Sequence, residues 1–220
     1  GSCRLTIKVG DKDRELIVDN FDIPQGFINI EGTGSLKLYV KDDIKFGGGT
    51  IINHPNPPTN FATANQENII NNAKNATPEQ CNAAADKLSI YYKGTENEGT
   101  NKDFDIVGNQ YLYGSVFAED ANVTIDGSGV MVGNLITGGK SVKIGGGSGI
   151  SSNLIYAPDA DVHVLGSAKI NGPIVSNIFT FSGGNSSSMK FDPRDGLAGD
   201  TFDIVTPGEV IITEGVAREQ

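Results

Sequence analysis

A five-residue phrase that keeps returning constrains the fold of this chain more than any other feature of its sequence. In each copy two apolar residues flank a variable residue, and a second variable residue and a glycine follow. The regular copies begin at Phe104, Val123, Val142, Val162 and Phe179, so the steps between them are 19, 19, 20 and 17 residues. A further copy begins upstream at Ile44. A near-constant period of this size indicates an architecture of stacked repeats.

The phrase has the pattern of a short β-strand, because alternation places its two apolar side chains on one face. A second apolar stretch precedes each copy, as residues 114–118 precede Val123, and a third apolar point follows, as Val130 does. Three short strands in each turn are typical of a parallel β-helix, in which no turn buries its apolar face alone. We therefore predict an all-β fold, a parallel, right-handed β-helix solenoid with a small α-helical insertion. The predicted inward ladders are Val123, Val142 and Val162, and Ile125, Ile144 and Val164.

The insertion interrupts the repeats between residues 54 and 87. Residues 54–58 contain three prolines, which cannot donate to a strand ladder. Two short helices are expected after them, and the second has a clear start, with Thr77 as its cap, Pro78 in the first turn and Gln80 completing a capping box. We expect the pair to pack against the solenoid or to cap its open end, since an uncovered terminal turn invites edge-to-edge pairing.

The rest of the chain divides around this insertion. Residues 1–2 have the composition of a cloning scar, from which we expect that the natural N-terminus was removed. Residues 3–53 are assigned to N-terminal strands and the first turns, and residues 88–195 to the β-helix repeats. Residues 196–220 form a C-terminal tail with strand candidates at 202–205 and 210–213. The position of these two candidates relative to the solenoid is left open.

The charge balance argues against two classes of partner. The chain has 17 Lys and Arg residues against 27 Asp and Glu residues, which gives a formal charge of −10. Because no basic patch with interleaved aromatic residues occurs, we expect no binding to nucleic acid. The acidity also disfavours adsorption to anionic membranes, and no stretch of the sequence has the length of a membrane-spanning helix.

The sequence contains two cysteines, Cys3 and Cys81. If the protein is exported, they permit one disulfide that would tie the N-terminus to the insertion. Two unrelated thiols are an equally good interpretation, because neither the spacing nor the context selects pairing. Two cysteines so far apart carry no ligand signature, so we expect no metal site and no cofactor.

Two carboxylates invite comparison with the polysaccharide lyases and hydrolases that share the β-helix fold. Asp120 and Asp159 occupy equivalent positions two turns apart, roughly 10 Å by the spacing of strands, a separation that suits an inverting pair. Both lie at corners, where turn chemistry alone favours aspartate. No basic residue repeats beside them, and the sequence suggests no aromatic platform for sugar stacking. We therefore predict no catalytic residues and no enzymatic activity.

The other candidates are isolated. Asp126 starts an Asp-Gly-Ser-Gly turn reminiscent of calcium sites, but the next turns have no acidic residue at its position, which favours a glycine-rich corner. His54 lies in the proline-rich turn, and His163 points to solvent if its valine neighbours point inward. A single histidine in each place has no partner for a metal site or a relay. Residues 186–188, three serines, lack a nucleophile elbow. Chance explains the sequons at Asn75, Asn122 and Asn185.

Residues 113–125 and 153–164 resemble the rungs of a known β-helical domain, with an apolar pair, an Ala-Pro-like corner and a closing Val-x-apolar strand. That domain occurs in bacterial surface proteins of the type IV pilus-assembly and minor-pilin-like kind. The resemblance covers residues 36–46 and 88–192, although Glu119 stands where the family has proline. It implies an extracellular, pilus- or envelope-associated subunit that contacts a membrane only through a removed N-terminal helix. Other pilus or envelope subunits, and a host or surface ligand, are the implied partners.

Three functions are consistent with the sequence. The first is a non-catalytic structural or adhesive module of a pilus-like assembly, in which a stiff rod presents loops away from the cell. The second is a carbohydrate-active β-helix enzyme. The absence of a catalytic set of carboxylates and bases in the sequence counts against it. The third is a self-polymerising, bactofilin-like cytoskeletal β-helix. The helical insertion counts against the third, because end-to-end polymers need bare terminal turns.

Overall fold

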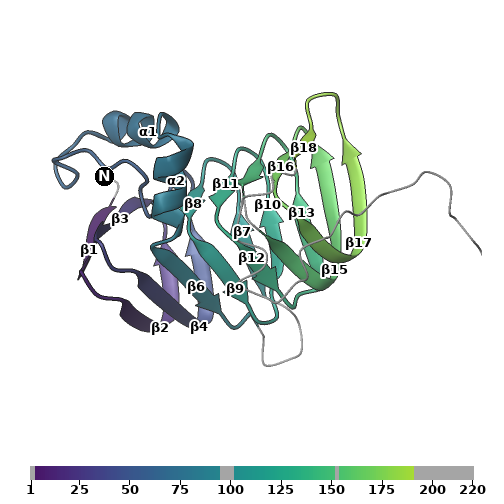
Figure 1. Cartoon of the computed structure of the whole chain (residues 1–220), viewed down its shortest axis with the longest axis horizontal. Helices are drawn as coiled ribbons and strands as arrows, with labels where there is room; N and C mark the ends of the chain where they lie inside the picture. Colours follow the sequence, from purple (N-terminus) through teal and green to yellow (C-terminus); the bar gives the residue numbers. More distant parts are fainter. Residues whose placement is uncertain (1–2, 95–101, 152–153, 191–220) are drawn as a thin grey trace, which may run out of the picture.

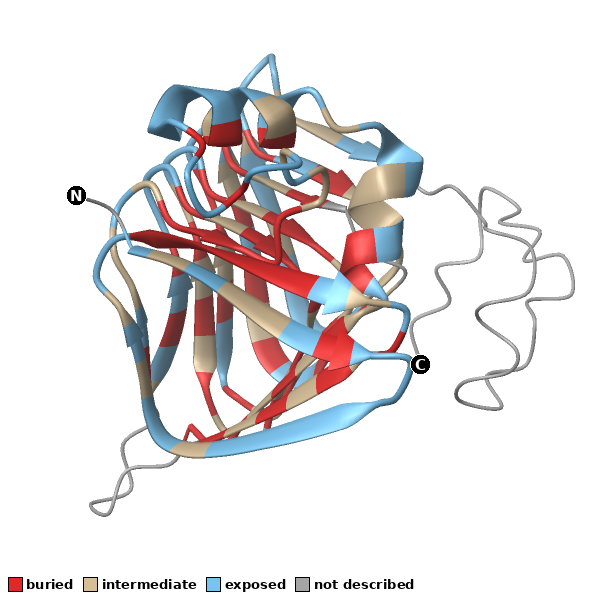
Figure 2. Ribbon diagram, turned by 90° about the vertical axis from the view of Figure 1, so that its left-hand side faces the viewer, coloured by how far each residue is buried: buried red, intermediate tan, exposed pale blue. Residues whose placement is uncertain are grey.

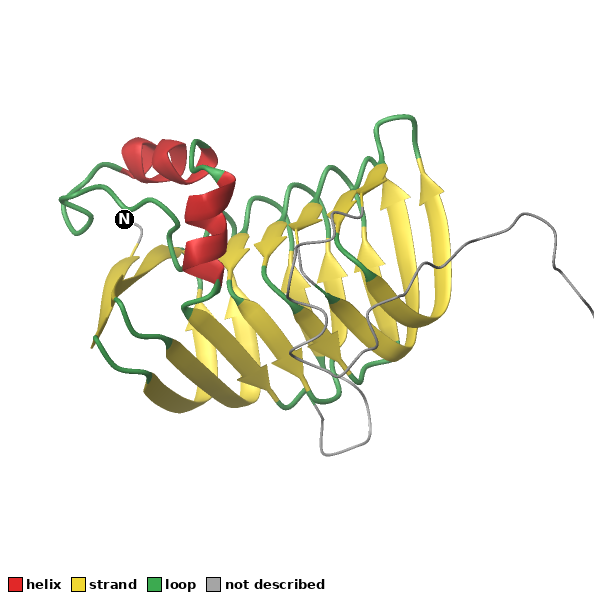
Figure 3. Ribbon diagram, viewed as in Figure 1, coloured by secondary structure: helices red, strands yellow, loops and turns green. Residues whose placement is uncertain are grey.

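The computed structural model describes residues 3–94, 102–151 and 154–190, and their strands form two sheets that wind around one core (Figure 1). The first sheet contains, in spatial order, β1 (Cys3–Gly10), β3 (Gly26–Gly32), β5 (Ile51–Ile52), β8 (Tyr111–Tyr113), β11 (Val130–Val132), β14 (Gly149–Ser151), β16 (Lys169–Asn171) and β18 (Ser188–Lys190). The second contains β2 (Arg14–Ile23), β4 (Leu36–Phe46), β6 (Leu88–Tyr92), β9 (Ser115–Ala118), β12 (Leu135–Thr137), β15 (Ile155–Gly166), β13 (Ser141–Ile144), β10 (Asn122–Ile125) and β7 (Asp103–Ile106), with β17 (Ile174–Gly183) against β15. The strand pairs of both sheets are parallel, which confirms the predicted all-β, parallel β-helix with a small helical insertion (Figure 3).

The second sheet bends, so each rung, meaning one turn of the solenoid, has three faces. Face 1 is the first sheet. Face 2 consists of β6, β9 and β12 together with the first halves of the long strands β2, β4, β15 and β17. Face 3 consists of β7, β10 and β13 together with the second halves of those long strands. The bend is marked by shifts of register, between Val18 and Asn20 in β2 and between Ala157 and Asp161 in β15.

The predicted inward ladders of face 3 are confirmed. Val123 pairs in register with Val142, which pairs with Val162, and the next inward positions repeat this for Ile125, Ile144 and Val164. All six side chains are buried. Burial of one such side chain contributes about 1.5–3 kcal/mol, so the ladders are a main source of stability. Because each rung covers its neighbours, the contribution depends on the whole stack.

The glycine that closes each phrase forms a tight corner. Gly127, Gly146 and Gly166 stack in successive rungs with φ of +70°, +62° and +64°. A Cβ atom added to Gly146 would lie 2.7 Å from the backbone nitrogen and oxygen of Gly127 in the rung beside it. The corner therefore needs glycine twice over, for its left-handed backbone and for the close approach of two rungs.

The helical insertion packs on the outer side of face 1. It contains α1 (Gln66–Lys74) and α2 (Pro78–Ala85), and the predicted capping box of Thr77 and Gln80 is present. Ile69 of α1 and Ala84 of α2 join a buried cluster with Phe27, Ile51 and Tyr113 of the sheet. Figure 2, which looks along the solenoid from its N-terminal side, shows the helices beside the end of the barrel. The helices thus pack against a side of the solenoid and do not cap its open end.

Asn53, the last residue before the insertion, forms hydrogen bonds to both the helices and the sheet. Its side-chain amide donates hydrogen bonds to the carbonyl oxygens of Ala84 in α2, at 2.5 Å, and Tyr113 in β8, at 2.9 Å. Its backbone is left-handed, with φ of +61°, a conformation that asparagine tolerates better than most residues. The side chain is buried, so these two bonds fix the insertion to the sheet.

Candidate functional site

The three faces have different chemistry at their outward positions. On face 3 the outward row is polar in the rungs from β7 to β17, where alternate residues point away from the core. The row runs in register through Asp105, Thr124, Lys143, His163 and Thr180. The predicted outward direction of His163 is confirmed by its exposure. A polar row of this kind is a solvated surface that needs no cover.

On face 1 the outward residues of β3, β5, β8 and β11 that face the insertion are apolar, and protein covers them, whereas outward residues of β16 and β18 such as Lys169 and Lys190 are polar. Phe27, Ile51, Tyr113 and Val132 come from consecutive strands of the sheet and are buried in the cluster formed with the helical insertion. Burial raises the pKa of Tyr113 far above its ordinary value. On face 1, therefore, the apolar outward residues are buried under the helical insertion.

On face 2 the outward row is apolar as well, and neither helix lies on it (Figure 1). We call this row the aromatic stripe, and its members pair in register over seven rungs: Ile17, Tyr39, Tyr91, Phe117, Ile136, Tyr156 and Val175. Ile17 is 61% exposed, Tyr156 36% and Val175 38%. Contiguous apolar rows on an outer surface mark interaction sites more often than scattered apolar residues do.

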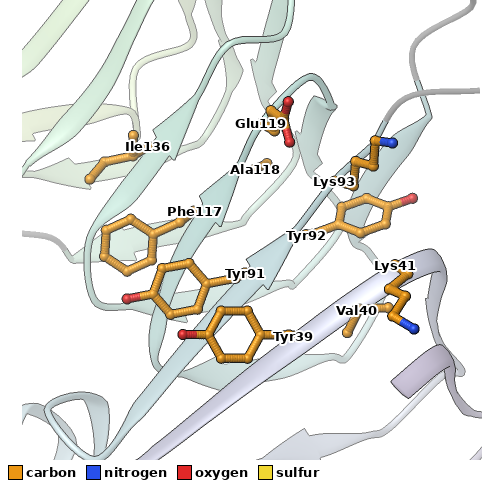
Figure 4. A pocket seen from close by; sticks show the side chains of 10 residues that line it. All are labelled: Tyr39, Val40, Lys41, Tyr91, Tyr92, Lys93, Phe117, Ala118, Glu119 and Ile136. Atoms are coloured by element: carbon orange, nitrogen blue, oxygen red, sulfur yellow. The ribbon is translucent and has the colours of Figure 1, made fainter. Parts of the chain in front are cut away.

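The centre of the stripe is a stack of three rings (Figure 4). The ring centroids of Tyr39 and Tyr91 lie 4.8 Å apart with an interplanar angle of 17°, and those of Tyr91 and Phe117 lie 4.8 Å apart at 11°. Stacking at the rung spacing turns the ring faces toward one another. The inner ring faces are therefore occupied, and the stripe offers ring edges and aliphatic side chains to a partner.

A groove runs beside the three rings, bounded on its other side by the next outward positions. Those positions hold Lys41, Lys93 and Glu119, and the groove has a volume of about 500 Å³ (Figure 4). The Lys41 ammonium lies 3.1 Å from a carboxylate oxygen of Asp19 in an exposed ion pair. The groove thus has one apolar wall and one charged wall, with more basic than acidic groups at its rim.

A second groove, of about 730 Å³, lies on face 3 between the second half of β4 and β7. These strands are not paired in the sheet, because β7 ends the strand order and β4 pairs with β2 and β6. The carboxylates of Asp22, Asp43, Asp103 and Asp105 line it together with two lysines. Partial burial, and then the charge of Asp103, raise the pKa of Asp105. An ion pair with Lys45 partly neutralises Asp43.

The carboxylates singled out from the sequence lie elsewhere, at corners. Asp159 is exposed and forms an ion pair with Lys140 at 3.5 Å. Asp120 is half-buried, and its backbone N–H donates to the carbonyl of Lys93. Neither residue lines either groove. The two carboxylates therefore lie apart from both grooves.

Asp126 has a structural role in the corner that its glycine-rich sequence indicated. Its carboxylate accepts from the Lys143 ammonium at 2.8 Å and from the backbone N–H of Gly127 at 2.7 Å. These hydrogen bonds, the one to Lys143 first, lower the pKa of Asp126. Asn122, from the second sequon, is used in the same way, because its side-chain oxygen accepts from the backbone N–H groups of Lys140 and Ser141.

His54 is buried under the insertion. Its Nδ1 accepts from the backbone N–H of Asn56, so Nε2 carries the proton and donates to the carbonyl of Ile69 at 2.8 Å. The ring also contacts Phe61 edge-on, at 5.8 Å between centroids. Burial lowers the pKa of His54. It is a fully hydrogen-bonded neutral histidine that fixes α1 to the proline-rich turn.

Both cysteines are free thiols in the structure. Cys3 is exposed at the start of β1, whereas Cys81 on α2 packs against the cluster on face 1, where burial raises its pKa. The disulfide, one of the two interpretations of the sequence, is therefore not formed here. The three serines at 186–188 belong to the turn before β18 and to its start, and the Ser187 hydroxyl donates to the carbonyl of Gly184. The sequon at Asn185 lies in the described part of the chain, in the turn before β18. The strand candidates at 202–205 and 210–213 do not, because residues 191–220 lie outside it.

The aromatic stripe and the two grooves were not foreseen from the sequence, whose analysis considered aromatic residues only as a platform for sugar stacking. Tyr39, Tyr91 and Phe117 are separated by 52 and 26 residues, because the insertion and a segment that includes residues 95–101 lie between their rungs. The signal that could have found them is the outward position beside each inward pair. Tyr39 lies between Leu38 and Val40, and the other two rings occupy the same place in their rungs.

Among the described residues no group of three or more His, Cys, Asp and Glu side chains is arranged to hold a metal ion, and no helix is long and apolar enough to cross a membrane. No family model, no curated protein and no solved structure matches the chain. The resemblance to pilus-associated domains therefore stays a prediction.

Proposed function

We propose that this chain is a non-catalytic structural and adhesive module of an extracellular, pilus-like surface assembly, as a minor or tip pilin-like subunit would be. The aromatic stripe is the surface through which it contacts a neighbouring subunit. One observation carries the proposal: one outward row of face 2 is apolar in seven successive rungs, with three rings stacked at its centre. The solenoid holds these side chains at a fixed spacing, which reduces the ordering cost of binding.

The chemistry of the stripe favours a protein partner over a sugar. Sugar rings bind to open aromatic faces, whereas the facing sides of Tyr39, Tyr91 and Phe117 are occupied by one another. Ring edges and aliphatic side chains suit a flat or ridged apolar protein surface. The lysines at 41 and 93 on the groove rim favour a partner with acidic residues beside its apolar strip.

The enzymatic alternative has one specific observation in its favour, the acidic groove on face 3. A carboxyl group whose pKa is raised by burial and by a neighbouring carboxylate is the usual form of a general acid. Desolvation and then the charge of Asp103 raise the pKa of Asp105, although the residue is exposed, and it lines a groove large enough for a sugar unit. The decisive assay is turnover of acidic and neutral polysaccharides by the native chain and by Asp105→Asn. Turnover that persists after repurification and is lost in Asp105→Asn would replace the proposal with this alternative.

The filament alternative has one observation in its favour, because the insertion packs on face 1 and leaves the N-terminal end of the described solenoid open. Leu5 and Leu16, in the first rung, are exposed although their register partners Ile28 and Leu38 are buried. The argument that the helices protect an end is therefore wrong. Cytosolic filaments formed by the native protein would support this alternative, and electron microscopy of cells that produce it tests the point directly.

Site-specific photo-crosslinking in the cells that make the protein tests the proposed function. A benzoylphenylalanine at Tyr91 samples the stripe, and the same residue at His163 samples the polar row of face 3 at a matched outward position. We expect position 91 to crosslink to another subunit of a surface assembly, identified by mass spectrometry, and position 163 not to. Equal crosslinking at both positions, or partners restricted to the cytosol, would refute the proposal.

A further inference from the structure

The C-terminal end of the described solenoid exposes side chains that belong to the core. Phe179 and Phe181 of β17 lie in register on Val162 and Val164, which are buried, yet they are 42% and 45% exposed. Met189 of β18 lies in register on the buried Ile170 and is 46% exposed. These residues are accessible because no further rung among the described residues lies above them, whereas their side chains continue the inward ladders.

Such an end is unfavourable for two physical reasons. Burial of large apolar side chains stabilises the folded state, and these three side chains are buried only in part. In addition, β17 is an edge strand, and its free N–H and C=O groups form a template for another chain. The end therefore requires an occupant that supplies apolar side chains at the spacing of a rung.

The chain that follows β18 contains this spacing. Residues 202–205 repeat residues 104–107 letter for letter, as Phe-Asp-Ile-Val, and in the first copy the phenylalanine and isoleucine are fully buried ladder positions. Val210 follows Phe202 by eight residues. The same separation joins the inward residues of faces 3 and 1 in four rungs: Phe104 and Leu112, Val123 and Met131, Val142 and Ile150, and Val162 and Ile170.

The spacing before Phe202 agrees as well. Leu197 precedes Phe202 by five residues, and Ile174 precedes Phe179 by five residues in the last described rung. Ile174 lies in register on the buried Ile155 and packs against the core, so it is the inward residue of face 2 in that rung. Leu197, Phe202 and Val210 therefore supply one apolar residue for each of the three faces.

We propose that residues 197–212 of this same chain dock on the C-terminal end of the solenoid, with Phe202 and Ile204 over Phe179 and Phe181, and Val210 over Met189. The end is then closed by the protein's own tail. Closure prevents end-to-end assembly through this end and leaves the side of the solenoid for partners. This inference is independent of the proposed function, since it concerns a different surface and a different occupant.

Disulfide trapping tests the register of docking in the full-length chain. Thr180 lies between Phe179 and Phe181, and Asp203 lies between Phe202 and Ile204. Residues paired in adjacent strands lie about 4.8 Å apart, within the range that a disulfide spans. In a background with Cys3→Ser and Cys81→Ser, we expect Thr180→Cys/Asp203→Cys to form an intramolecular bond under mild oxidation.

The matched control is Thr124→Cys/Asp203→Cys, because Thr124 occupies the same outward row three rungs away. We expect this pair to stay reduced under the same conditions. An intermolecular disulfide at Thr180→Cys would mean that a second copy covers the end, and equal oxidation of both pairs would mean that the tail has no fixed register. Either result, or free thiols in both variants, overturns the inference.

Hydrogen exchange supplies a second readout that needs no disulfide. Ile204→Asp places a charge at a docked position, whereas Val205→Asp changes the residue that corresponds to Val107, which is exposed on the outside of its rung. We expect Ile204→Asp to speed the exchange of the β17 amides at least tenfold and Val205→Asp to leave it within about twofold. Unchanged exchange of β17 in Ile204→Asp contradicts docking.

Discussion

Faces 2 and 3 are built by the same rungs and even by the same long strands, but their outward rows have opposite chemistry. On face 3 the row consists of Asp105, Thr124, Lys143, His163 and Thr180, whereas on face 2 it is the aromatic stripe. The inward ladders of both faces are buried and mostly apolar, with Thr137 as a polar member on face 2. Inward residues therefore determine the fold in this solenoid, and outward residues are free to differ by face. A difference that the fold does not require points to interaction with something else.

The largest effect on stability is expected when a charge is placed in an inward ladder. Ile144→Asp buries a carboxylate between Ile125 and Val164, where it has no partner of opposite charge. We expect loss of the cooperative unfolding transition, measured by circular dichroism during thermal and urea unfolding, since neighbouring rungs depend on one another. The control is His163→Asp at an outward position, which should cost no more than about 0.5 kcal/mol. A native-like melt of Ile144→Asp would show that the assigned register is incorrect.

A second change tests the covered apolar face. Ile69 is fully buried between α1 and the sheet, so Ile69→Ala should lower the free energy of unfolding by about 2–5 kcal/mol or release the insertion locally. Ile70→Ala, at a partly buried neighbour on the same helix, should cost clearly less. Urea unfolding combined with limited proteolysis of residues 54–87 separates global from local loss. Equal costs for the two variants would contradict the packing of α1.

A third change removes a ring from the aromatic stripe, on which neither helix lies. Tyr91 stacks on a ring at each side, so Tyr91→Ala should lower the free energy of unfolding by about 1–3 kcal/mol. Thr124→Ala, at an outward position of the polar row, should change it by about 0.5 kcal/mol or less. Tyr91→Phe keeps the stack and should behave like the native chain in urea. If Tyr91→Ala and Thr124→Ala lower the free energy of unfolding equally, the ring stack does not contribute to stability. The two faces would then differ only in the residues they expose.

The smallest effect on stability is expected from a change of pH. It concerns the helical insertion that packs on face 1. Burial lowers the pKa of His54 below 6.5, so the unfolded chain binds more protons at this residue than the folded chain as the pH falls. The stabilising contribution of the neutral ring is complete above pH 6.5 and is lost as the pH falls through the folded-state pKa. Hydrogen exchange of α1 at pH 7.5 and at pH 5.0 measures this loss. The variant His163→Gln should retain the pH dependence, and an α1 that is equally protected at both pH values would contradict it.

The sequence was informative where the structure depends on local alternation. The phrase identified the strands of face 3, the inward ladders and the corner glycines, because an inward pair and its glycine lie within five residues. The capping box of Thr77 and Gln80 was equally local. Asp126 was placed correctly in a corner, although its bond to Lys143 depends on the next rung.

The parts that the sequence did not predict depend on contacts between distant segments. Tyr39, Tyr91 and Phe117 belong to rungs separated by the insertion and by residues 95–101, so no short pattern joins them. The side of the solenoid chosen by the helices is set by apolar outward residues of face 1, such as Phe27 and Tyr113, whose role becomes clear only once the strands are stacked. The acidic groove arises because β4 and β7 are not paired, a break in the ladder that alternation does not encode.

The insertion also has a consequence for how the molecule responds to mechanical load. Its buried cluster contacts β3, β5, β8 and β11, which are four consecutive strands of face 1. Beyond β11, rungs are held by their immediate neighbours, so tension applied at the C-terminal side should detach them singly and at low force. The four bridged rungs have to yield together with both helices, at a higher force. Under stretching, the protein should therefore extend in small steps and then stop at a resistant block near its N-terminal side.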